Sequence, residues 1–424
     1  MSVSSRHMQW SLFLFALVVY GAASIFFSTP GVVGDEPRYL DGAAGLLSGQ
    51  FVAPEDPQII NGPGYPFLLA PMVALGFSLE AMRLANAVLV ALAIWFTYRA
   101  SVPYAGPRWA FGAAAVIAVH PVLLKSASYV YSEALATFCI ASFGWAMTTL
   151  LRRHGLGQRA GILLPAVCVL ALAWLVLTRV LFGYVLVAMT LLVGVWILVR
   201  RGMTRAWRTA FIILVLSFGA CIPYLGYTYQ LTGQMFKWST NGGELLYWAT
   251  STHPGETGSW FSEIHAISRP ELAPNHAAFF ERIRPLAALE REAAFRTQAL
   301  ENIRANPVGV LKNWVANINR LAFGFPRSFE AQEVRTTPKV LIQLPILVLF
   351  ALALFCMARW PRRVPPETWL LCGMAVIYLG LSTVPPATPR YFVVVLPWIG
   401  IVTAAVLGPR LRIRLDDVPW IGER

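Results

Sequence analysis

The sequence predicts an all-α membrane protein that crosses the bilayer about ten times, within a range of ten to twelve. Two observations lead to this class. The 424 residues are 57% hydrophobic and only 13% charged, about half the charged fraction of an ordinary soluble chain. Long apolar segments also recur along most of the sequence, and a run of about 20 such residues spans the hydrocarbon core of a bilayer.

Eleven apolar segments can be delimited. The first follows a short head and lacks a small-residue cleavage site, so we expect an anchor rather than a removed signal peptide. Segment 64–78 is short and rich in glycine and proline, which predicts an interfacial or re-entrant helix at the outer face. The remaining ten predict membrane-spanning helices at residues 10–28, 80–99, 108–124, 127–151, 160–178, 181–199, 207–228, 338–358, 367–384 and 390–408.

Basic residues are distributed unevenly between the two sides of this arrangement. If the N-terminus is cytoplasmic, the cytoplasmic loops and tails carry seventeen of the 34 lysines and arginines. The short outer connections carry few cations, mainly Arg38, Lys125, Arg179 and Arg390. This asymmetry is typical of multi-pass membrane proteins and predicts that both termini are cytoplasmic. The net charge of +13 therefore reflects topology and does not indicate nucleic-acid binding.

These patterns divide the chain into three regions. Residues 1–228 form an N-terminal membrane module, whose outer loop at 29–79 is expected to carry catalytic groups. Residues 229–337 form a periplasmic loop region, and an amphipathic run at 286–305 predicts that its second half is helical. Residues 338–424 contain the last spans and a cytoplasmic tail.

Neither the cysteines nor the histidines predict a metal site. The five cysteines lie inside apolar segments without CxxC spacing, which is typical of packing residues: Cys139, Cys168, Cys221, Cys356 and Cys372. Three histidines are widely spaced in the outer region, as expected for satisfied or exposed side chains rather than ligands: His253, His265 and His276. We therefore expect neither a metal nor another cofactor.

The stretch 34–42 directly follows the first span and carries charges of both signs. Charges such as those of Asp35, Glu36 and Arg38 are costly near a bilayer and usually serve a function. A carboxylate can take the proton of a hydroxyl acceptor, and an arginine binds phosphate with two parallel hydrogen bonds. We interpret the stretch as a base beside an anion site. The alternative is a polar loop that caps a helix.

Other isolated charges are predicted at the same outer face, although they come from distant parts of the sequence: Lys125, Glu133, Arg179 and Arg390. A shared pocket of acids and arginines there would suit a substrate with a phosphate head group and a lipid tail. Each residue also has a simpler interpretation. The cations can extend from the ends of spans towards water, and Glu133 can stabilise the start of its helix.

The sequence Asp35-Glu36-Pro37-Arg38-Tyr39 resembles the Asp-Glu-x-Arg-Tyr signature of GT-C glycosyltransferases. Within that superfamily it is similar to the protein O-mannosyltransferases and the lipid A aminoarabinose transferases. Further stretches occur in the same order as in these enzymes: residues 61–66, 83–86, 177–179, 223–229, 239–243 and 389–391, with Pro397. The resemblance covers nearly the whole chain and depends on this shared order.

The resemblance implies a GT-C fold and a glycosyltransferase of the bacterial inner membrane. Such an enzyme moves a sugar from a polyprenyl-phosphate donor to an envelope lipid, glycan or protein at the periplasmic face, by inverting displacement. Its partners would be donor, acceptor and membrane lipids. The resemblance and the charge pattern together give the expected site residues: Asp35 and Glu36 as catalytic carboxylates, Arg38, Arg179 and Arg390 on the donor phosphate, and Tyr39, Asn61, Tyr65, Lys125 and Glu133 in substrate binding. Lys125 and Glu133 come from the charge pattern alone.

Within this assignment Asp35 occupies the position of the base, and Glu36 would hold the acceptor or orient Arg38. The sequence departs from the lipid A enzymes at Asn61, where they have a lysine that contacts phosphate. Arg179 or Arg390 would then replace that cation.

Two other classes remain open. A ligase or polymerase of envelope polysaccharide also has many spans, but would use arginine and histidine in a large outer loop instead of an Asp-Glu pair after the first span. A transporter or flippase of lipid-linked sugars would show broken helices at matching positions of two halves, and the sequence has no such pairing.

Overall fold

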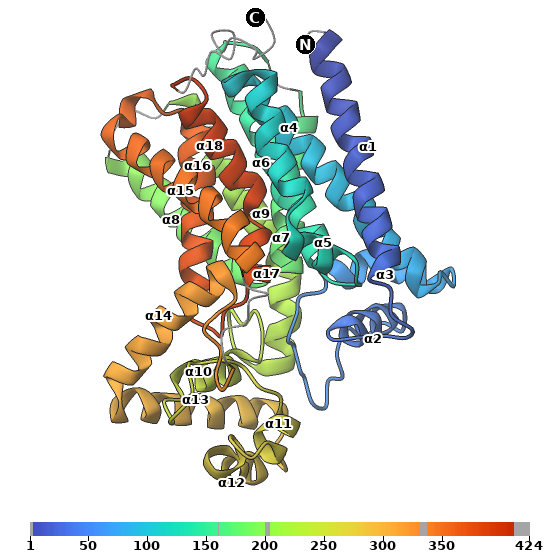
Figure 1. Ribbon diagram of the computed structural model, residues 1–424, viewed down its shortest axis with the longest axis vertical. Coiled ribbons are helices and arrows are strands. Elements are labelled where there is room, and N and C mark those ends of the chain that lie inside the picture. The colour runs from blue at the N-terminus through green and yellow to red at the C-terminus, as the bar shows by residue number, and fades with distance from the viewer. Residues whose placement is uncertain (1–2, 160, 200–203, 331–336, 411–424) are drawn as a thin grey trace, which may run out of the picture.

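The computed structural model of the protein describes residues 3–159, 161–199, 204–330 and 337–410. Within these ranges every regular element is a helix and no β-strand occurs, which confirms the predicted all-α class (Figure 1). The helices are α1 (Val3–Phe26), α2 (Glu36–Leu47), α3 (Gly64–Ala74), α4 (Leu79–Ala118), α5 (Pro121–Ala127), α6 (Glu133–Gly155), α7 (Leu163–Thr178), α8 (Leu181–Val199), α9 (Arg205–Thr232), α10 (Gly242–Thr250), α11 (Glu263–Ser268), α12 (Ala273–Ile283), α13 (Ala288–Ala305), α14 (Pro307–Phe323), α15 (Thr337–Arg359), α16 (Pro366–Leu381), α17 (Pro389–Val393) and α18 (Leu396–Leu407). The predicted cytoplasmic tail and several predicted cytoplasmic cations lie outside the described residues: Arg200, Arg201, Arg412, Arg414 and Arg424.

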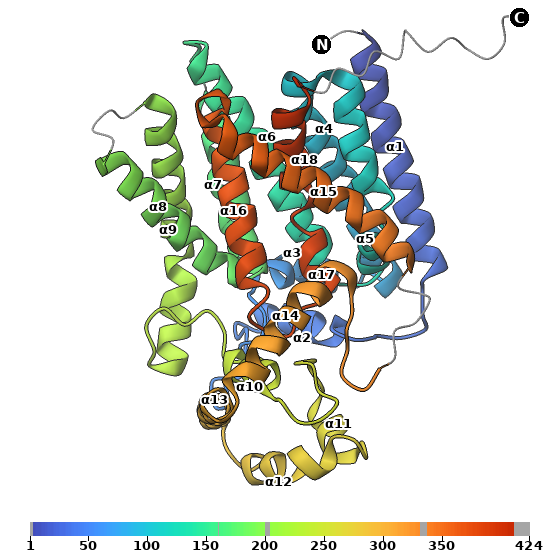
Figure 2. The same ribbon diagram turned by 60° about the vertical axis from the view of Figure 1, so that its left-hand side comes forward.

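Most of these helices form one membrane-crossing bundle (Figures 1 and 2). In the described ranges, six helices are long and apolar enough to span a bilayer: α1, α4, α6, α8, α9 and α15. Four shorter apolar helices accompany them: α3, α7, α16 and α18. Every predicted span coincides with one of these helices or with half of α4, and α3 corresponds to the short segment 64–78. The five cysteines are buried and unpaired, as expected for packing residues.

Helix α4 is a hairpin of two spans. Its 40 residues would reach about 60 Å if straight, roughly twice the hydrocarbon thickness of a bilayer. The helix is interrupted at Gly106, whose φ of 76° lies in the left-handed region, between prolines 103 and 107. A Cβ at Gly400 of α18 would meet Thr97 at 3.7 Å and Ala113 at 3.8 Å, so the two arms lie side by side. The arms correspond to the predicted spans 80–99 and 108–124.

The two ends of α6 define two polar ends of the bundle. At its C-terminal end, the guanidinium of Arg152 lies over the ring of Tyr104, whose hydroxyl donates to Glu367 at 2.5 Å. At its N-terminal end, Glu133 meets arginines from α7 and α17. Figure 1 shows the start of α1 and the end of α18 at the end opposite to α10–α13. Which of these ends faces the cytoplasm stays a prediction.

The outer region, α10–α14, has a hydrophobic core of its own that includes Tyr247, Trp248, Phe280 and Phe295. One buried histidine is tied into this core. The hydroxyl of Tyr247 lies 2.5 Å from His276 Nδ1, and His276 Nε2 lies 2.7 Å from a carboxylate oxygen of Glu256. The predicted amphipathic run 286–305 is α13. A histidine in such a network is a satisfied core residue, as the sequence predicts.

The first outer loop is fastened to this outer region. The backbone N–H of Ile59 donates to Thr240 Oγ1 at 2.8 Å, and the N–H of Thr240 donates back to the Ile59 carbonyl at 2.7 Å. Asp56 accepts the N–H of Ala288 at the start of α13 at 2.6 Å. The loop that follows α2 is therefore a fixed wall between the bundle and the outer region.

Candidate functional site

Helix α2 places two adjacent acids in different environments. Asp35 is the residue before its first turn, and its side chain does not cap the helix. Pro37 lies in that first turn, where its missing N–H leaves no helical hydrogen bond unmade. The side chain of Asp35 is about one-third exposed, at 32%, whereas that of Glu36 is fully buried. Only Asp35 is therefore accessible to a substrate.

The carboxylate of Glu36 is fully engaged in hydrogen bonds within the protein. It accepts two hydrogen bonds from Arg83, from Nε at 2.8 Å and from Nη2 at 2.7 Å, and one each from the backbone N–H groups of Val33 and Val130. Burial raises the pKa of the Glu36 carboxyl, but these hydrogen bonds outweigh it and hold the pKa below its usual range. The partner of Glu36 is Arg83 and not Arg38, which gives Glu36 a structural position.

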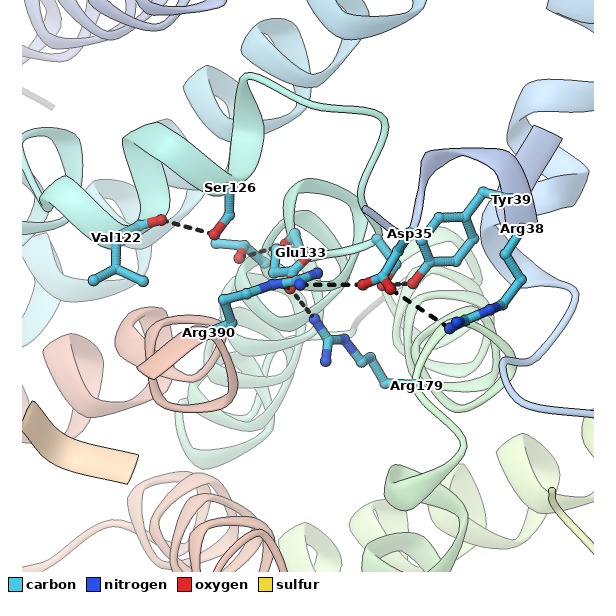
Figure 3. Close-up of polar contacts among 10 residues, drawn as sticks. Asp35, Arg38, Tyr39, Val122, Ser126, Glu133, Arg179 and Arg390 are labelled. Atoms are coloured by element: carbon cyan, nitrogen blue, oxygen red, sulfur yellow. Dashed lines mark hydrogen bonds and ion pairs between the residues drawn. The ribbon is translucent and has the colours of Figure 1, made fainter. Parts of the chain in front are cut away.

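Asp35, Glu133, Arg179 and Arg390 meet in one ion-pair network (Figure 3). Arg390 Nε lies 2.5 Å from Glu133 Oε1, and its Nη1 donates to Asp35 Oδ2 at 3.1 Å. Arg179 Nη2 lies 2.7 Å from the same Glu133 oxygen. Four separate segments of the chain thus supply two arginines and two carboxylates at one place, as the sequence predicts for the outer face.

Arg179 keeps unused hydrogen-bond donors although it is largely buried, with 14% of its side chain exposed. Its Nε atom has no hydrogen-bond partner, and its Nη2 atom is engaged only by the ion pair with Glu133. The ring of Tyr391 lies 5.6 Å from its guanidinium. Buried donors without partners are costly, so this arginine is suited to bind an anion.

Two cavities lie near this network: Arg179 lines one, and Arg38, whose Nη1 atom is 3.6 Å from Asp35 Oδ1, lines the other. The apolar cavity, about 520 Å³, is lined by Arg179 and by many aliphatic side chains, including Val180, Leu181, Leu245, Leu246, Leu381 and Val384. The polar cavity, about 750 Å³, lies between α2 and the first outer loop and is lined by Arg38, Asp41, Gln50, Phe51, Asp56 and Gln58, among others. Ile60 and Asn61 line both cavities, so the two meet there. The arrangement can hold a lipid-linked anion on one side and a polar molecule on the other.

The remaining predicted residues lie at different distances from this centre. Arg38 lines the polar cavity, 44% exposed, with Nη1 3.6 Å from Asp35 Oδ1. Tyr39 also lines that cavity, and its hydroxyl shares a 2.8 Å hydrogen bond with Ser132. Burial raises the pKa of Tyr39 to about 12, so this hydroxyl stays protonated.

Tyr65 and Lys125 do not reach the centre. Tyr65 is fully buried, donates to Asn86 at 3.0 Å and lines neither cavity, so it packs α3 against α4. Lys125 is exposed on α5 and makes no contact with the ion-pair network.

Two neighbours of the site were not predicted from the sequence, one cationic and one aromatic. Arg296 of α13 lines the apolar cavity, and the guanidinium of Arg390 lies 4.3 Å from the ring centre of Tyr131. Tyr131 stands two residues before Glu133, which was a usable signal. Arg296 had none, because it is one of several charges on an amphipathic helix.

No protein-family model matches the sequence, and no curated protein matches it either. Among solved structures, the chain is similar to the oligosaccharyltransferase of Archaeoglobus fulgidus, AglB. The apo form matches with a TM-score of 0.53 and 16% identity over 95% of this chain and 51% of that one. The complex with an inhibitory peptide and a dolichol-phosphate gives 0.50 and 14% over 96% and 50%. ArnT from Cupriavidus metallidurans, bound to undecaprenyl phosphate, gives 0.39 and 17% over 94% and 76%.

At these identities the likeness to AglB shows the fold alone. It confirms the predicted GT-C fold of an all-α multi-pass membrane protein. The chain spans about half the length of the AglB chains it matches. The ligands of AglB are therefore properties of AglB and are not assigned to this chain by the comparison.

Proposed function

We propose that the protein is a membrane glycosyltransferase that moves a sugar from a polyprenyl-phosphate donor to a hydroxyl acceptor at the outer membrane face. The observation that carries the proposal is Arg179, which lines an apolar cavity, has a buried Nε donor without a partner, and belongs to the same ion-pair network as the accessible carboxylate of Asp35. An apolar cavity with a buried cation fits a phosphate on a lipid chain. The dolichol-phosphate bound by AglB is in keeping with such a donor.

The donor phosphate would bind Arg179 and Arg390. Both arginines are already held by Glu133, which is fully buried and has one oxygen without a hydrogen-bond partner. Glu133 therefore positions the two cations rather than touching the sugar. Arg38 lines the other cavity, so we place it on the acceptor side.

Asp35 would act as the base. It takes the proton of the acceptor hydroxyl while the acceptor oxygen forms a bond to the anomeric carbon on the face opposite the phosphate. The bond from that carbon to the phosphate oxygen breaks, and its electron pair leaves with polyprenyl phosphate. The two arginines stabilise the departing anion. The configuration at the anomeric carbon inverts, and no cofactor takes part.

The test is release of undecaprenyl phosphate by the purified protein in detergent, supplied with a mixture of undecaprenyl-phosphate sugars and an extract of cell-envelope acceptors. Arg179→Ala should weaken binding of undecaprenyl phosphate roughly ten- to a hundredfold, because hydrogen bonds to a charged group are lost. Arg284→Ala is the matched control, since Arg284 is 58% exposed and pairs with Glu263 in the outer region. If Arg179→Ala binds undecaprenyl phosphate as well as wild type does, the assignment of the donor site is wrong. If the wild-type protein releases undecaprenyl phosphate from none of the donors, the proposed transferase activity is wrong.

A further inference from the structure

The polar cavity has two walls that differ in origin. One wall is α2, which contributes Arg38, Asp41 and the backbone around Gly42. The other is the first outer loop, from Gln50 to Gly62. Asp35 does not line the cavity itself, but Gly34 before it does. Arg38 also lines the cavity, and its Nη1 atom lies 3.6 Å from Asp35 Oδ1, so a ligand in the cavity would lie close to the proposed base.

The cavity presents free hydrogen-bonding groups of both kinds. Asp41 is exposed and Gln50 is exposed, and neither side chain has a partner among the described residues. Asn61 has a buried Nδ2 atom without a hydrogen-bond partner, at the junction with the apolar cavity. A carboxylate accepts hydrogen bonds, and an amide both donates and accepts them. Vicinal hydroxyl groups, each a donor and an acceptor, match this set.

An aromatic ring completes the lining. Phe51 is half-buried at the cavity wall, and its ring is backed by Tyr227 at a centroid distance of 6.5 Å. The backbone N–H of the next residue, Val52, donates to the hydroxyl of Tyr227 at 3.2 Å. A ring fixed in this way offers a flat apolar surface beside polar groups, which suits the C–H face of a sugar.

Hydrogen bonds within the chain hold this wall in place. Asp56 accepts the N–H of Ala288 at 2.6 Å and the side-chain amide of Gln58 at 3.1 Å. Paired hydrogen bonds between Ile59 and Thr240 fix the following turn to the outer region. A wall held in place lowers the entropy cost of binding a flexible ligand.

The same lining disfavours the other acceptors. In the polar cavity a lipid tail would meet Arg38, Asp41 and Gln50 between short aliphatic patches, whereas the apolar cavity has the larger aliphatic lining. One common way to hold an extended peptide is to add it to the edge of a β-sheet, and the described ranges contain no strand that could do so. A helical peptide needs an apolar groove, which these side chains do not form.

We infer that the acceptor is a glycan, bound by its terminal sugar in the polar cavity with one hydroxyl directed at Asp35. The inference rests on the proposed transfer reaction and narrows its acceptor to a polyhydroxylated sugar. Gln50 and Asp41 hold the ring hydroxyls, Phe51 covers one face of the ring, and the Asn61 amide contacts the sugars where the two cavities meet.

The experiment is saturation-transfer NMR on the full protein in lipid nanodiscs. The probes are oligosaccharides of mannan, glucan and galactan, serine- and threonine-containing hexapeptides, and monoacylglycerol. We expect transfer to oligosaccharide protons, with a reduction of roughly fivefold or more in Gln50→Leu and in Asp41→Leu, since each loses at least one hydrogen bond. Glu55→Gln is the matched control, because Glu55 is exposed on the same loop and does not line the cavity.

Binding of undecaprenyl phosphate is measured in the same samples. Transfer to the peptides or to monoacylglycerol in place of the oligosaccharides would overturn the glycan assignment. If no oligosaccharide signal appears while undecaprenyl phosphate binds normally, the glycan assignment is also wrong, but the assignment of the donor site is unaffected. If the wild-type protein does not bind undecaprenyl phosphate, the proposed function itself is wrong. A wild-type oligosaccharide signal that both leucine variants retain would also exclude the polar cavity.

Discussion

Arg390 holds Asp35 across 355 positions of sequence, with its Nη1 atom 3.1 Å from Asp35 Oδ2. The same guanidinium also binds Glu133 through Nε. The proposed base is therefore oriented by the arginine that we assign to the donor phosphate. A phosphate that draws Arg390 towards itself would release Asp35 for the acceptor, so the donor is expected to bind before the acceptor reacts.

Asp35→Asn should leave a folded protein that binds donor but turns over 10²- to 10⁴-fold more slowly, roughly the contribution of a positioned base. Asparagine keeps the shape of aspartate and loses its basicity. Turnover is measured as undecaprenyl phosphate release per folded protein, with Glu55→Gln as the control variant. Near-wild-type turnover of Asp35→Asn would exclude Asp35 as the base.

Glu36→Gln should destabilise the protein instead of changing the chemistry. The Glu36–Arg83 pair is buried, with 0% and 1% of the side chains exposed, and removing one charge leaves the other unpaired. Such a change costs roughly 3–5 kcal/mol. The thermal midpoint in detergent should fall, while turnover per folded molecule stays within a few-fold of wild type.

Glu80→Gln is the matched control for that change, because Glu80 is an exposed acid in the first turn of α4, one turn before Arg83. Its thermal midpoint should match wild type. A Glu36→Gln protein that is fully stable and inactive would return Glu36 to the catalytic group that the sequence implied.

Acid should loosen the outer region through Glu256. Burial raises the pKa of this carboxyl, but hydrogen bonds from His276 and Ser251 outweigh it and hold the pKa below the usual 4.5. A lowered pKa means that the carboxylate stabilises the fold above pH 4.5 and that this contribution is lost as the pH falls through the lower folded value. The free energy of unfolding of the outer region should fall by on the order of 1.5–3 kcal/mol.

Hydrogen–deuterium exchange of the α10 and α12 amides in the full chain measures this effect, after correction for intrinsic exchange rates. Protection should fall below pH 4.5 in the wild type and in Glu271→Gln, an exposed control in the same region. Glu256→Gln should show weaker protection at neutral pH and a flatter dependence. An identical acid response in Glu256→Gln and wild type would contradict the assignment.

The membrane topology can be tested with reporter fusions. The outer region lies at the bundle end opposite to the start of α1 (Figure 1). Fusions after Asp56 and after Glu271 should read periplasmic, and a fusion after Arg205 should read cytoplasmic. A cytoplasmic signal after Glu271 would invert the protein and move the proposed reaction to the other face.

Hydropathy and charge alone determined the membrane class and the positions of the spans. A bilayer requires long apolar helices, so each span leaves a mark on its own stretch of sequence. The order of short sequence elements likewise predicted the GT-C fold and named Asp35, Arg179 and Arg390 as candidates, and the pattern of isolated charges added Glu133. These features are local, and local features can be read from a sequence.

Only the tertiary structure decided how the candidates divide their tasks. Asp35 and Glu36 are neighbours in sequence, but packing directs one to the arginine of α17 and the other to Arg83 of α4. The free donors of Arg179, and the meeting of two unlike cavities at Asn61, exist because α3, α7 and the outer region converge there. Charge pairing and burial depend on distances between segments far apart in the chain, and no local pattern of residues encodes those distances.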